Sequence, residues 1–274
     1  MLRVISLGAG VQSSTVFLMA CKGILTPKPD AAIFADTQWE PKEVYEWLGY
    51  LTELGAVHGL PIIQATRGNI RTDMLRATVR GTQRDGERAA SMPLYTTSDG
   101  MKEGMIRRQC TREYKIEVVE REVRRLLGLK PRQRAKANSA QFWLGISADE
   151  AGRMRDSRSS WYSNHYPLIF NREPAMTRKD CIEWLEAHGF PIPRKSACLG
   201  CPYHSNTEWR AIKENVEEWS DVTDFDNRIR NRGGHRGTLY VHRTCKPLAE
   251  VDLSTAEERG QMNWIEECTG MCGL

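Results

Sequence analysis

The order of the first apolar runs restricts the fold of this chain more than any other feature of its sequence. Leu2–Leu7, Ala31–Ala35 and Leu60–Gln64 each have the length of a buried strand. The two segments between them, Ser13–Cys21 and Lys42–His58, have helical periodicity. Strands that alternate with helices form a parallel sheet through right-handed crossovers. The sequence therefore predicts an α/β, Rossmann-like parallel sheet with helices on both faces.

The rest of the chain continues this alternation and then becomes mostly helical. One more strand and four more helices are predicted, at Phe142–Ile146, Glu113–Leu127, Thr177–His188 (with a capping box from Thr177 to Asp180), Thr207–Val216 and Val222–Arg230. Ala65–Gly100 is polar and too long for an ordinary connection, which is typical of a functional lid or a mobile segment. We expect a division near residue 150, between an α/β domain of residues 1–150 and a mostly helical C-terminal region of residues 151–274.

Composition excludes several classes of protein. With eight Trp, eight Tyr and six Phe, the chain carries too much apolar area for extended disorder. No apolar run approaches the roughly 20 residues of a membrane-spanning helix, so we expect no membrane partner. The first residues lack a signal-peptide layout, which favours a cytoplasmic location. There, the eight cysteines are more typical of metal or redox sites than of disulfides. The net charge of +4 permits a nucleic-acid partner without requiring one.

A glycine-rich turn follows the first predicted strand. Gly8 and Gly10 let the backbone approach a ligand closely, and the start of the next helix attracts phosphate through its N–H groups and dipole. Hydroxyl groups that add neutral donors come from Ser6, Ser13 and Ser14. The turn lacks the Gly-Lys-Ser/Thr of a Walker motif and the spacing of the dinucleotide fingerprint. Taken alone, it is equally typical of a plain tight turn.

Gly8-Ala9-Gly10-Val11-Gln12-Ser13 resembles the pyrophosphate-binding loop of the PP-loop ATP pyrophosphatases, the adenine nucleotide alpha-hydrolase-like superfamily. More narrowly, it resembles that of the phosphoadenosine phosphosulfate (PAPS) reductase family. Val11 and Gln12 replace the lysine and aspartate of the usual loop, which leaves a Mg²⁺ requirement open. The resemblance implies that ATP or a related adenine nucleotide binds over the turn, with contacts from Ser6, Gly8, Gly10, Gln12, Ser13 and Ser14.

Two further segments belong to the same predicted edge of the sheet. Phe34–Glu40 is similar to the family's Asp-Thr-Gly segment, which implies that Asp36 and Thr37 lie beside the nucleotide and that Asp36 takes part in catalysis; a plain helix cap is the alternative for Asp36. Trp143–Arg155 is similar to a family stretch that contacts substrate or phosphate. The resemblance assigns these contacts to Gly145, Glu150, Arg153 and Arg155. Structural ion pairing is the alternative for the charged residues.

Cysteines form a second group of candidate site residues. Cys198 and Cys201 stand two residues apart on a Gly/Pro loop, where two thiolates can reach one metal or cluster; a redox dithiol or coincidence is the alternative. Cys110 lies among cations, which lower the pKa of a thiol and attract anions, although a solvated basic helix start has the same composition. Cys21 and Cys181 lie on apolar helical faces and are predicted to be inert core residues.

The segment around Cys110 resembles the family's Arg-Arg-Cys-Cys segment, with Gln109 in place of the first cysteine. The resemblance implies a [4Fe–4S] cluster held by Cys110, Cys198 and Cys201, and makes Arg107 and Arg108 candidate catalytic residues. Zinc is the alternative, with His204 as a candidate fourth ligand. For the fourth cluster ligand we expect Cys268, with Cys245, Cys272 or no residue as the alternatives.

The function that the resemblance implies is ATP-dependent adenylation followed by sulfur transfer. In the superfamily, ATP is split between its α- and β-phosphates, and a nucleophile then displaces AMP. The acceptor would be tRNA, DNA or a small metabolite, and the sulfur would come from a donor protein. Two basic segments, Lys130–Lys136 and Arg67–Arg88, are candidates for contact with a phosphate backbone; the alternative is that they are solvated faces. An oligomer is compatible with the sequence.

Two alternative functions stay open. The first is reduction of PAPS or adenylylsulfate with a thioredoxin-like partner. It rests on the last residues, Glu266–Leu274, which resemble the mobile Glu-Cys-Gly segment of the reductases and make Cys272 the candidate nucleophile. The second is a nucleotide-binding iron–sulfur module without catalysis.

Overall fold

The computed structural model describes residues 1–76, 92–98, 101–230, 237–255 and 258. The chain divides into two compact units, each built from several stretches. Unit 1 consists of Met1–Asp36, Lys42–Arg67 and Lys115–Ser196. Unit 2 consists of Thr37–Pro41, Gly68–Tyr114 and Ala197–Leu274. No helix among the described residues is long and apolar enough to cross a membrane.

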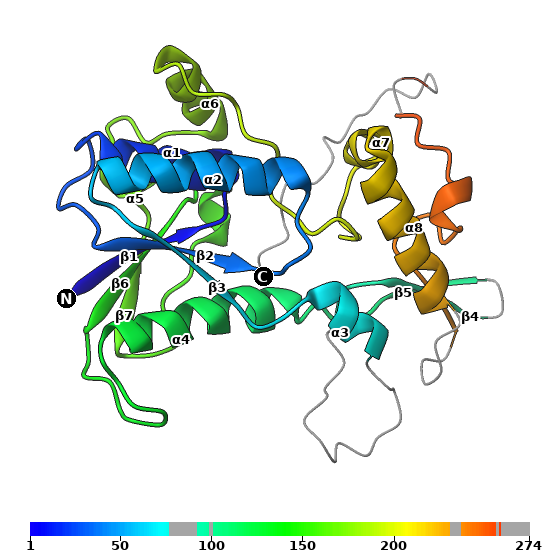
Figure 1. The fold of residues 1–274 in the computed structure, drawn as a ribbon, viewed down its shortest axis with the longest axis horizontal. Helices are drawn as coiled ribbons and strands as arrows, with labels where there is room; N and C mark the ends of the chain where they lie inside the picture. The colour runs from blue at the N-terminus through cyan, green and yellow to red at the C-terminus, as the bar shows by residue number, and fades with distance from the viewer. Residues whose placement is uncertain (77–91, 99–100, 231–236, 256–257, 259–274) are drawn as a thin grey trace. The chain divides into compact units, whose positions relative to one another are not determined.

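Unit 1 contains a five-stranded parallel sheet with the strand order β3-β2-β1-β6-β7 (Figure 1). The strands are β1 (Leu2–Leu7), β2 (Ala31–Asp36), β3 (Ile62–Thr66), β6 (Ala140–Leu144) and β7 (Tyr162–His165). β2 is buried except at its last residue, and β1 consists of buried and half-buried residues, as expected for strands covered on both faces. This sheet confirms the predicted α/β, Rossmann-like class.

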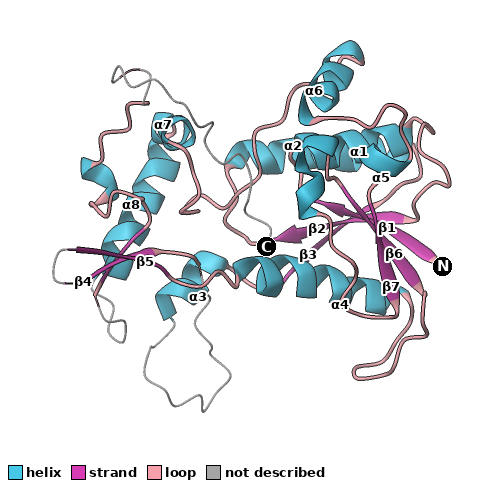
Figure 2. Cartoon of the chain, turned by 180° about the vertical axis from the view of Figure 1, so that it is seen from behind, coloured by secondary structure: helices cyan, strands magenta, loops and turns pink. Residues whose placement is uncertain are grey.

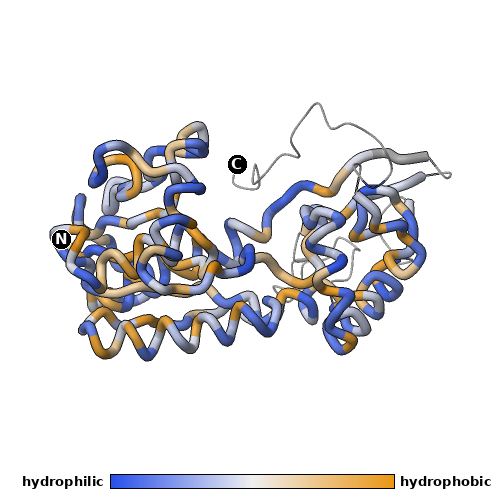
Figure 3. Tube along the Cα trace, turned by 90° about the horizontal axis from the view of Figure 1, so that it is seen from above, coloured by the Kyte–Doolittle hydropathy of each residue, from blue (hydrophilic) through white to orange (hydrophobic). Residues whose placement is uncertain are grey.

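Helices cover both faces of the sheet. They are α1 (Val11–Cys21), α2 (Lys42–Val57), α4 (Glu117–Leu126), α5 (Pro167–Phe170) and α6 (Arg178–Ala187). α1 and α2 lie on one face and α4 on the other (Figures 1 and 2). Apolar and hydrophilic positions alternate along α2 and α4, which each have one face for the core, whereas α1 is buried on nearly all sides (Figure 3). α6 starts at the predicted capping box, in which Thr177 accepts from the Asp180 N–H and Asp180 accepts from the Thr177 N–H.

Unit 2 contains a three-stranded antiparallel sheet of order β5-β4-β8, with helices packed beside it. Its elements are α3 (Ile70–Arg76), β4 (Tyr95–Ser98), β5 (Met101–Met105), α7 (Asn206–Glu214), α8 (Val216–Arg230) and β8 (Thr238–Tyr240). Trp209, Phe225 and Leu239 are buried in its core. A π-helical turn at Thr111–Ile116 leads from Cys110 into α4.

Some predicted boundaries differ from the structure. Unit 1 extends past residue 150 to Ser196, because β7 pairs with β6 in the same sheet. The helix expected at Val222–Arg230 begins at Val216, since Asn215 accepts from the N–H groups of its first turn and thereby caps it. The strand β7 and the short helix α5 were not predicted; four residues are too few to show a period.

Candidate functional site

The order of the strands in unit 1 reverses at β1. β2 and β3 lie on one side of β1, whereas β6 and β7 lie on the other. Doubly wound sheets bind their ligands at such a reversal, outside the carboxyl ends of the strands. The turn Gly8–Gly10 follows β1, and the segment Gly145–Glu150 follows β6. Both predicted binding segments therefore leave the sheet at this point.

The turn after β1 presents main-chain donors at the start of α1. Ala9 has a positive φ of 58°, and Gly10 is the N-cap of the helix. Within the described residues, no side chain caps α1 and its first turn carries no acidic group. The Ser13 hydroxyl accepts from the Gly8 N–H at 3.2 Å and lies 3.2 Å from the Gly10 carbonyl oxygen, so it holds the turn closed. The first N–H groups and the positive end of the helix dipole are thus left to an anion.

Gly145 allows the two loops to meet. A Cβ atom at this position would lie 2.7 Å from both the N and Cα atoms of Ser13 and 2.9 Å from the carbonyl carbon of Gln12. These are backbone atoms, which cannot give way as a flexible side chain can. Glycine is therefore required here by the close approach of two loops, a reason that the sequence did not predict; the expected nucleotide contact of Gly145 stays a prediction.

A hydrogen-bond network joins the same two loops. The Gln12 amide Nε2 lies 3.5 Å from the buried Ser147 hydroxyl and 3.3 Å from Glu150 Oε2. Arg153 forms an ion pair of 2.7 Å with the other oxygen of Glu150. The structure thus brings Gln12, Glu150 and Arg153 together, and Glu150 and Arg153 form the structural ion pair that the sequence left open as the alternative to a substrate contact. The exposed Arg155 donates instead to the carbonyl oxygens of Gly152 and Met154.

Two other predicted nucleotide contacts have partners inside unit 1. Ser14 is fully buried, and its hydroxyl accepts a 2.9 Å hydrogen bond from the indole N–H of Trp47, which ties α1 to α2. Asp36 ends β2, and its Oδ1 accepts from the Tyr45 hydroxyl at 2.9 Å. Ser6 lies half-buried in β1. Among these three residues, Asp36 is at the carboxyl end of its strand, as predicted.

Thr37, the next residue, belongs to unit 2 and contacts a cysteine. It is 1% exposed, and its hydroxyl oxygen lies 3.2 Å from the Cys198 sulfur and 3.2 Å from Glu40 Oε1. The Cys198 sulfur is also 3.8 Å from this Glu40 oxygen. Sequence analysis assigned Thr37 to the nucleotide; its side chain is packed among Cys198 and Glu40.

The loop with Cys198 and Cys201 is seated on Trp39. The Leu199 N–H donates to the Trp39 carbonyl oxygen at 2.8 Å, and a Cβ atom at Gly200 would lie 2.2 Å from the indole ring. The ring itself is fixed, because its Nε1 donates to Asp221 at 2.6 Å. At position 200, between the two cysteines, any larger residue would overlap this ring, so glycine is required there.

His204 holds the same loop from the other end. Its Nε2 lies 2.9 Å from the Cys198 carbonyl oxygen, which only accepts, so Nε2 carries the proton. The same carbonyl accepts from the Cys201 N–H at 2.9 Å. His204 Nδ1 lies 3.9 Å from Glu208. The loop thus engages Nε2, whereas the buried Nδ1 has no hydrogen-bond partner among the described residues, and zinc binding by His204 stays a prediction.

All cysteines of unit 2 that the structure describes are half-buried: Cys110, Cys198, Cys201 and Cys245. Cys110 and Cys198 pack against the same core. Within the described part of the chain, no three His, Cys, Asp or Glu side chains are already arranged to hold a metal ion. The predicted ligand Cys268 and the predicted nucleophile Cys272 lie outside the described residues.

The two arginines before Cys110 differ in their surroundings. Arg107 is exposed, whereas Arg108 is half-buried with its guanidinium 5.4 Å from the centre of the Tyr203 ring. Tyr203 follows Cys201 by two residues, so this cation–π contact joins the Cys110 segment to the loop on Trp39. The contact between Arg108 and Tyr203 could not be predicted from the sequence pattern.

Cys21 and Cys181 are core residues of unit 1, which confirms the prediction. Burial raises the pKa of the Cys21 thiol to about 11, with a small opposing effect of Lys28. Burial also raises the pKa of the Cys181 thiol to about 12. Such thiols are protonated and unreactive at neutral pH.

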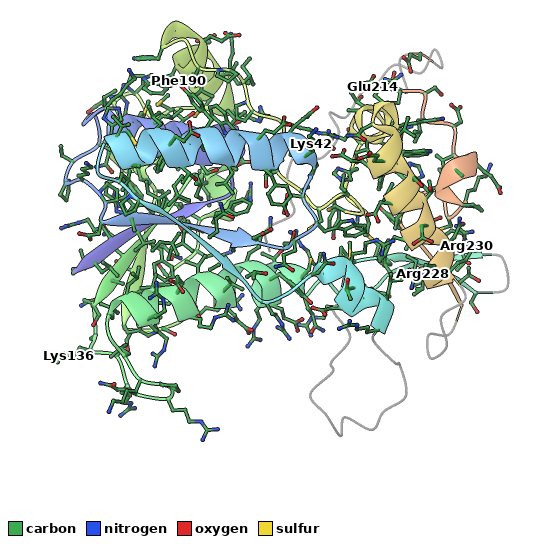
Figure 4. All side chains as sticks on the ribbon, in the orientation of Figure 1. Lys42, Lys136, Phe190, Glu214, Arg228 and Arg230 are labelled. Carbon is green, nitrogen blue, oxygen red and sulfur yellow. The ribbon has the colours of Figure 1, made fainter. Side chains whose placement is uncertain are left out.

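The basic run Lys130–Lys136 precedes β6. It lies at the amino edge of the sheet, because β6 is parallel to β1, whereas the Gly8–Gly10 turn leaves the carboxyl edge (Figure 4). In the other basic segment, Arg71 pairs with Asp221 and Asp224, and residues 77–88 lie outside the described residues.

The roles of Trp39 and His204 in holding the Cys198 loop were not predicted from the sequence. The signal for both was present: a glycine between the cysteines, a tryptophan three residues after Asp36, and a histidine three residues after Cys201. A comparison with protein-family models and with curated proteins finds no match to this chain.

Proposed function

We propose that the protein binds an adenine nucleotide on the Gly8–Ser13 turn and uses it to adenylate an acceptor, to which sulfur is then transferred with the help of a cysteine-held iron–sulfur cluster. The observation that carries the proposal is the position of this turn. It lies where the strand order reverses, at a helix start that no described side chain caps. Phosphate groups bind at such positions in α/β sheets.

The main-chain donors of the turn would hold the phosphates. Gln12 stands where the resembling family has an aspartate, and its amide is held by Ser147 and Glu150. This contact fixes the first turn of α1 against the loop after β6. Arg153 neutralises Glu150, so the carboxylate does not repel a bound phosphate. Donors fixed in this way stabilise charge without rearranging during the reaction.

The cysteines of unit 2 fit an iron–sulfur cluster by their chemistry. Thiolates are the ligands that such clusters take, and four half-buried thiols lie in one unit. A core of several irons keeps its ligands farther apart than a single metal ion does. When bound, a cluster would store or deliver sulfur. Trp39 and His204 orient the loop with Cys198 and Cys201, and Thr37 contacts the Cys198 sulfur.

Two short stretches of chain lead from the surroundings of the proposed nucleotide site to those of the cysteine loop, which supports a single reaction for both groups of residues. Asp36 is followed directly by Thr37, the partner of Cys198. A Cβ atom on Gly10 would lie 3.7 Å from the Ser196 nitrogen, and Ser196 precedes Cys198 by two residues. We therefore propose that the nucleotide turn and the cysteines serve one activity.

In the proposed reaction, an acceptor oxygen attacks the α-phosphorus of ATP, the bond from this phosphorus to the bridging oxygen breaks, and pyrophosphate leaves. A sulfur nucleophile then displaces AMP from the acceptor. Arg107 and Arg108 are the cations proposed to stabilise the developing phosphate charge. A cytoplasmic location belongs to the same proposal, because a reducing compartment keeps the thiols available.

Pyrophosphate release tests this function. Anaerobically purified protein is incubated with ATP, with and without tRNA or DNA, and released pyrophosphate is measured. We expect release that nucleic acid increases and that Gly145→Ala abolishes, whereas the matched control Gly152→Ala retains it, since a Cβ there meets no atom within 4 Å. Tight ATP binding without release contradicts adenylation and supports a module without catalysis.

Sulfonucleotide reduction is the second candidate. Val11 is buried and Gln12 is neutral, so the turn lacks the lysine that the ATP-cleaving members of the superfamily use. A reductase does not cleave ATP and has no need of this lysine. Thioredoxin-dependent release of sulfite from PAPS or adenylylsulfate, lost in Cys272→Ser, would favour this candidate over adenylation.

A further inference from the structure

Asn206 joins the start of α7 to the turn that ends at Cys245, both in unit 2. It lies in the first turn of α7, after the loop with Cys198 and Cys201, and is 4% exposed. Its Oδ1 lies 3.2 Å from His242 Nε2 and 3.3 Å from Arg243 Nη2. These two residues belong to the turn that ends at Cys245. One buried side chain thus fixes the Cys245 turn to the start of α7, the helix that follows the loop with Cys198 and Cys201.

The His242 ring fixes the turn from within. The Thr244 N–H donates to His242 Nδ1 at 3.2 Å, so the proton of the neutral ring is on Nε2, which donates to Asn206. The Cys245 N–H donates to the His242 carbonyl oxygen at 3.0 Å. Cys245 itself has a φ of +53°, a conformation that costs a non-glycine residue of order 1 kcal/mol and persists only where the surroundings enforce it.

Tyr95 lies beside the strand that leads into the Cys245 turn. It lies in β4 and pairs with Tyr240 of β8. Tyr240 precedes His242, and therefore the Cys245 turn, by two residues. Burial is the main cause that raises the pKa of the Tyr95 hydroxyl, and the charges of Tyr203, Cys245 and Cys201 raise it further, against the opposing effect of Arg243. The strand pairing of Tyr95 with Tyr240 places it beside the chain that leads into the Cys245 turn, and these charge effects agree with that placement. The Arg108–Tyr203 contact brings the Cys110 segment to the loop with Cys198 and Cys201.

From these contacts we infer that Cys245, and not a cysteine of the last residues, supplies the fourth thiolate beside Cys110, Cys198 and Cys201. The inference rests on the proposed iron–sulfur cluster and replaces Cys268, which the sequence favoured. The segments that carry all four thiols are joined within unit 2 by described contacts.

Iron and acid-labile sulfide, measured on the full chain after anaerobic purification and reconstitution with ferrous iron and sulfide, test the inference. We expect the wild type, Cys268→Ser and Cys272→Ser to hold the same amount of iron. Cys245→Ser is expected to lose most of it, as Cys198→Ser does. Full iron in Cys245→Ser, with loss in Cys268→Ser or Cys272→Ser, overturns the inference and leaves the proposed function standing. A wild type without iron refutes the cluster itself.

A second variant separates a ligand from a structural residue. Asparagine adopts a positive φ more readily than cysteine, so Cys245→Asn fits the backbone and removes the thiol. We expect the iron-free Cys245→Asn protein to melt at or above the temperature of the iron-free wild type and still to lose most of the iron on reconstitution. Iron at the wild-type level in this variant overturns the inference.

Discussion

Single residues set how closely the loops of each unit approach their neighbours. Gly145 and Gly200 both stand where a Cβ atom would overlap other atoms, the first with the backbone of Ser13 and the second with the ring of Trp39. The need for glycine comes from the neighbour in both cases and not from an unusual φ. Sequence reasoning identified both glycines as parts of motifs, but the neighbour that requires each one is a tertiary contact.

Gly145→Ala is expected to weaken the binding of ATP by tenfold or more, about 1.4 kcal/mol or greater. The added methyl group would displace the backbone of Gln12 and Ser13, whose main-chain donors form the proposed phosphate site. Equilibrium dialysis with labelled ATP measures the change, with Gly152→Ala as the control of unchanged affinity. Equal affinity for ATP in both variants would show that ATP binding does not depend on this turn.

Reactivity toward an alkylating reagent should distinguish the buried cysteines from the half-buried ones. We expect Cys21 and Cys181 to stay unmodified by iodoacetamide at pH 8 in the native, iron-free protein, because burial raises their pKa values to about 11 and about 12. The half-buried Cys198 and Cys201 are expected to react. Mass spectrometry of the digested protein measures each site; rapid labelling of Cys181 without denaturant would contradict its place in the core.

At the scale of elements, a cap formed by neighbours in the chain could be predicted from the sequence, whereas the pairing of distant elements could not. Thr177 and Asp180 form the capping box that their spacing indicated, because a cap involves only neighbours in the chain. By contrast, β7 is recognisable only by its pairing with β6, and the seat of the Cys198 loop on Trp39 joins residues about 160 positions apart. Periodicity and composition contain no information on such pairs.

Thr177→Ala is expected to lower the free energy of unfolding by about 1 kcal/mol at pH 7. The Thr177 side chain and backbone donate to Asp180 and lower the pKa of its carboxyl group. A carboxyl group whose pKa is lowered by folding stabilises the folded state at pH values above its ordinary pKa. This contribution to the free energy of unfolding is lost as the pH falls through the lowered pKa. Urea unfolding should therefore show a smaller difference between wild type and variant in acid; a constant difference would contradict the role of Asp180.

At the scale of the molecule, the chain passes between the two units after Asp36, Pro41, Arg67, Tyr114 and Ser196. Neither unit is one continuous stretch of sequence. A single division near residue 150 was expected, since a change in composition along the chain reveals only contiguous domains. The fold class was accessible because alternating strands and helices determine a parallel sheet; the grouping into units depends on contacts between distant stretches.

The fragment 1–150 is expected not to fold. It lacks β7 at the edge of the sheet, and it lacks four residues of the core shared with α1: Leu168, Met176, Cys181 and Leu185. Circular dichroism during heating should show no cooperative transition for the fragment, with the full chain as the control. A cooperative transition in the fragment would support the contiguous domain instead.

Hydrogen–deuterium exchange with and without ATP tests the central claim, that the turn after β1 is a nucleotide-phosphate site. The first N–H groups of α1 have no partner within the helix and exchange quickly unless a ligand covers them. We predict that ATP slows exchange in peptides covering residues 8–14 and 145–150 and leaves residues 130–136, at the opposite edge of the sheet, unchanged. Unchanged exchange at residues 8–14 in saturating ATP would contradict the account.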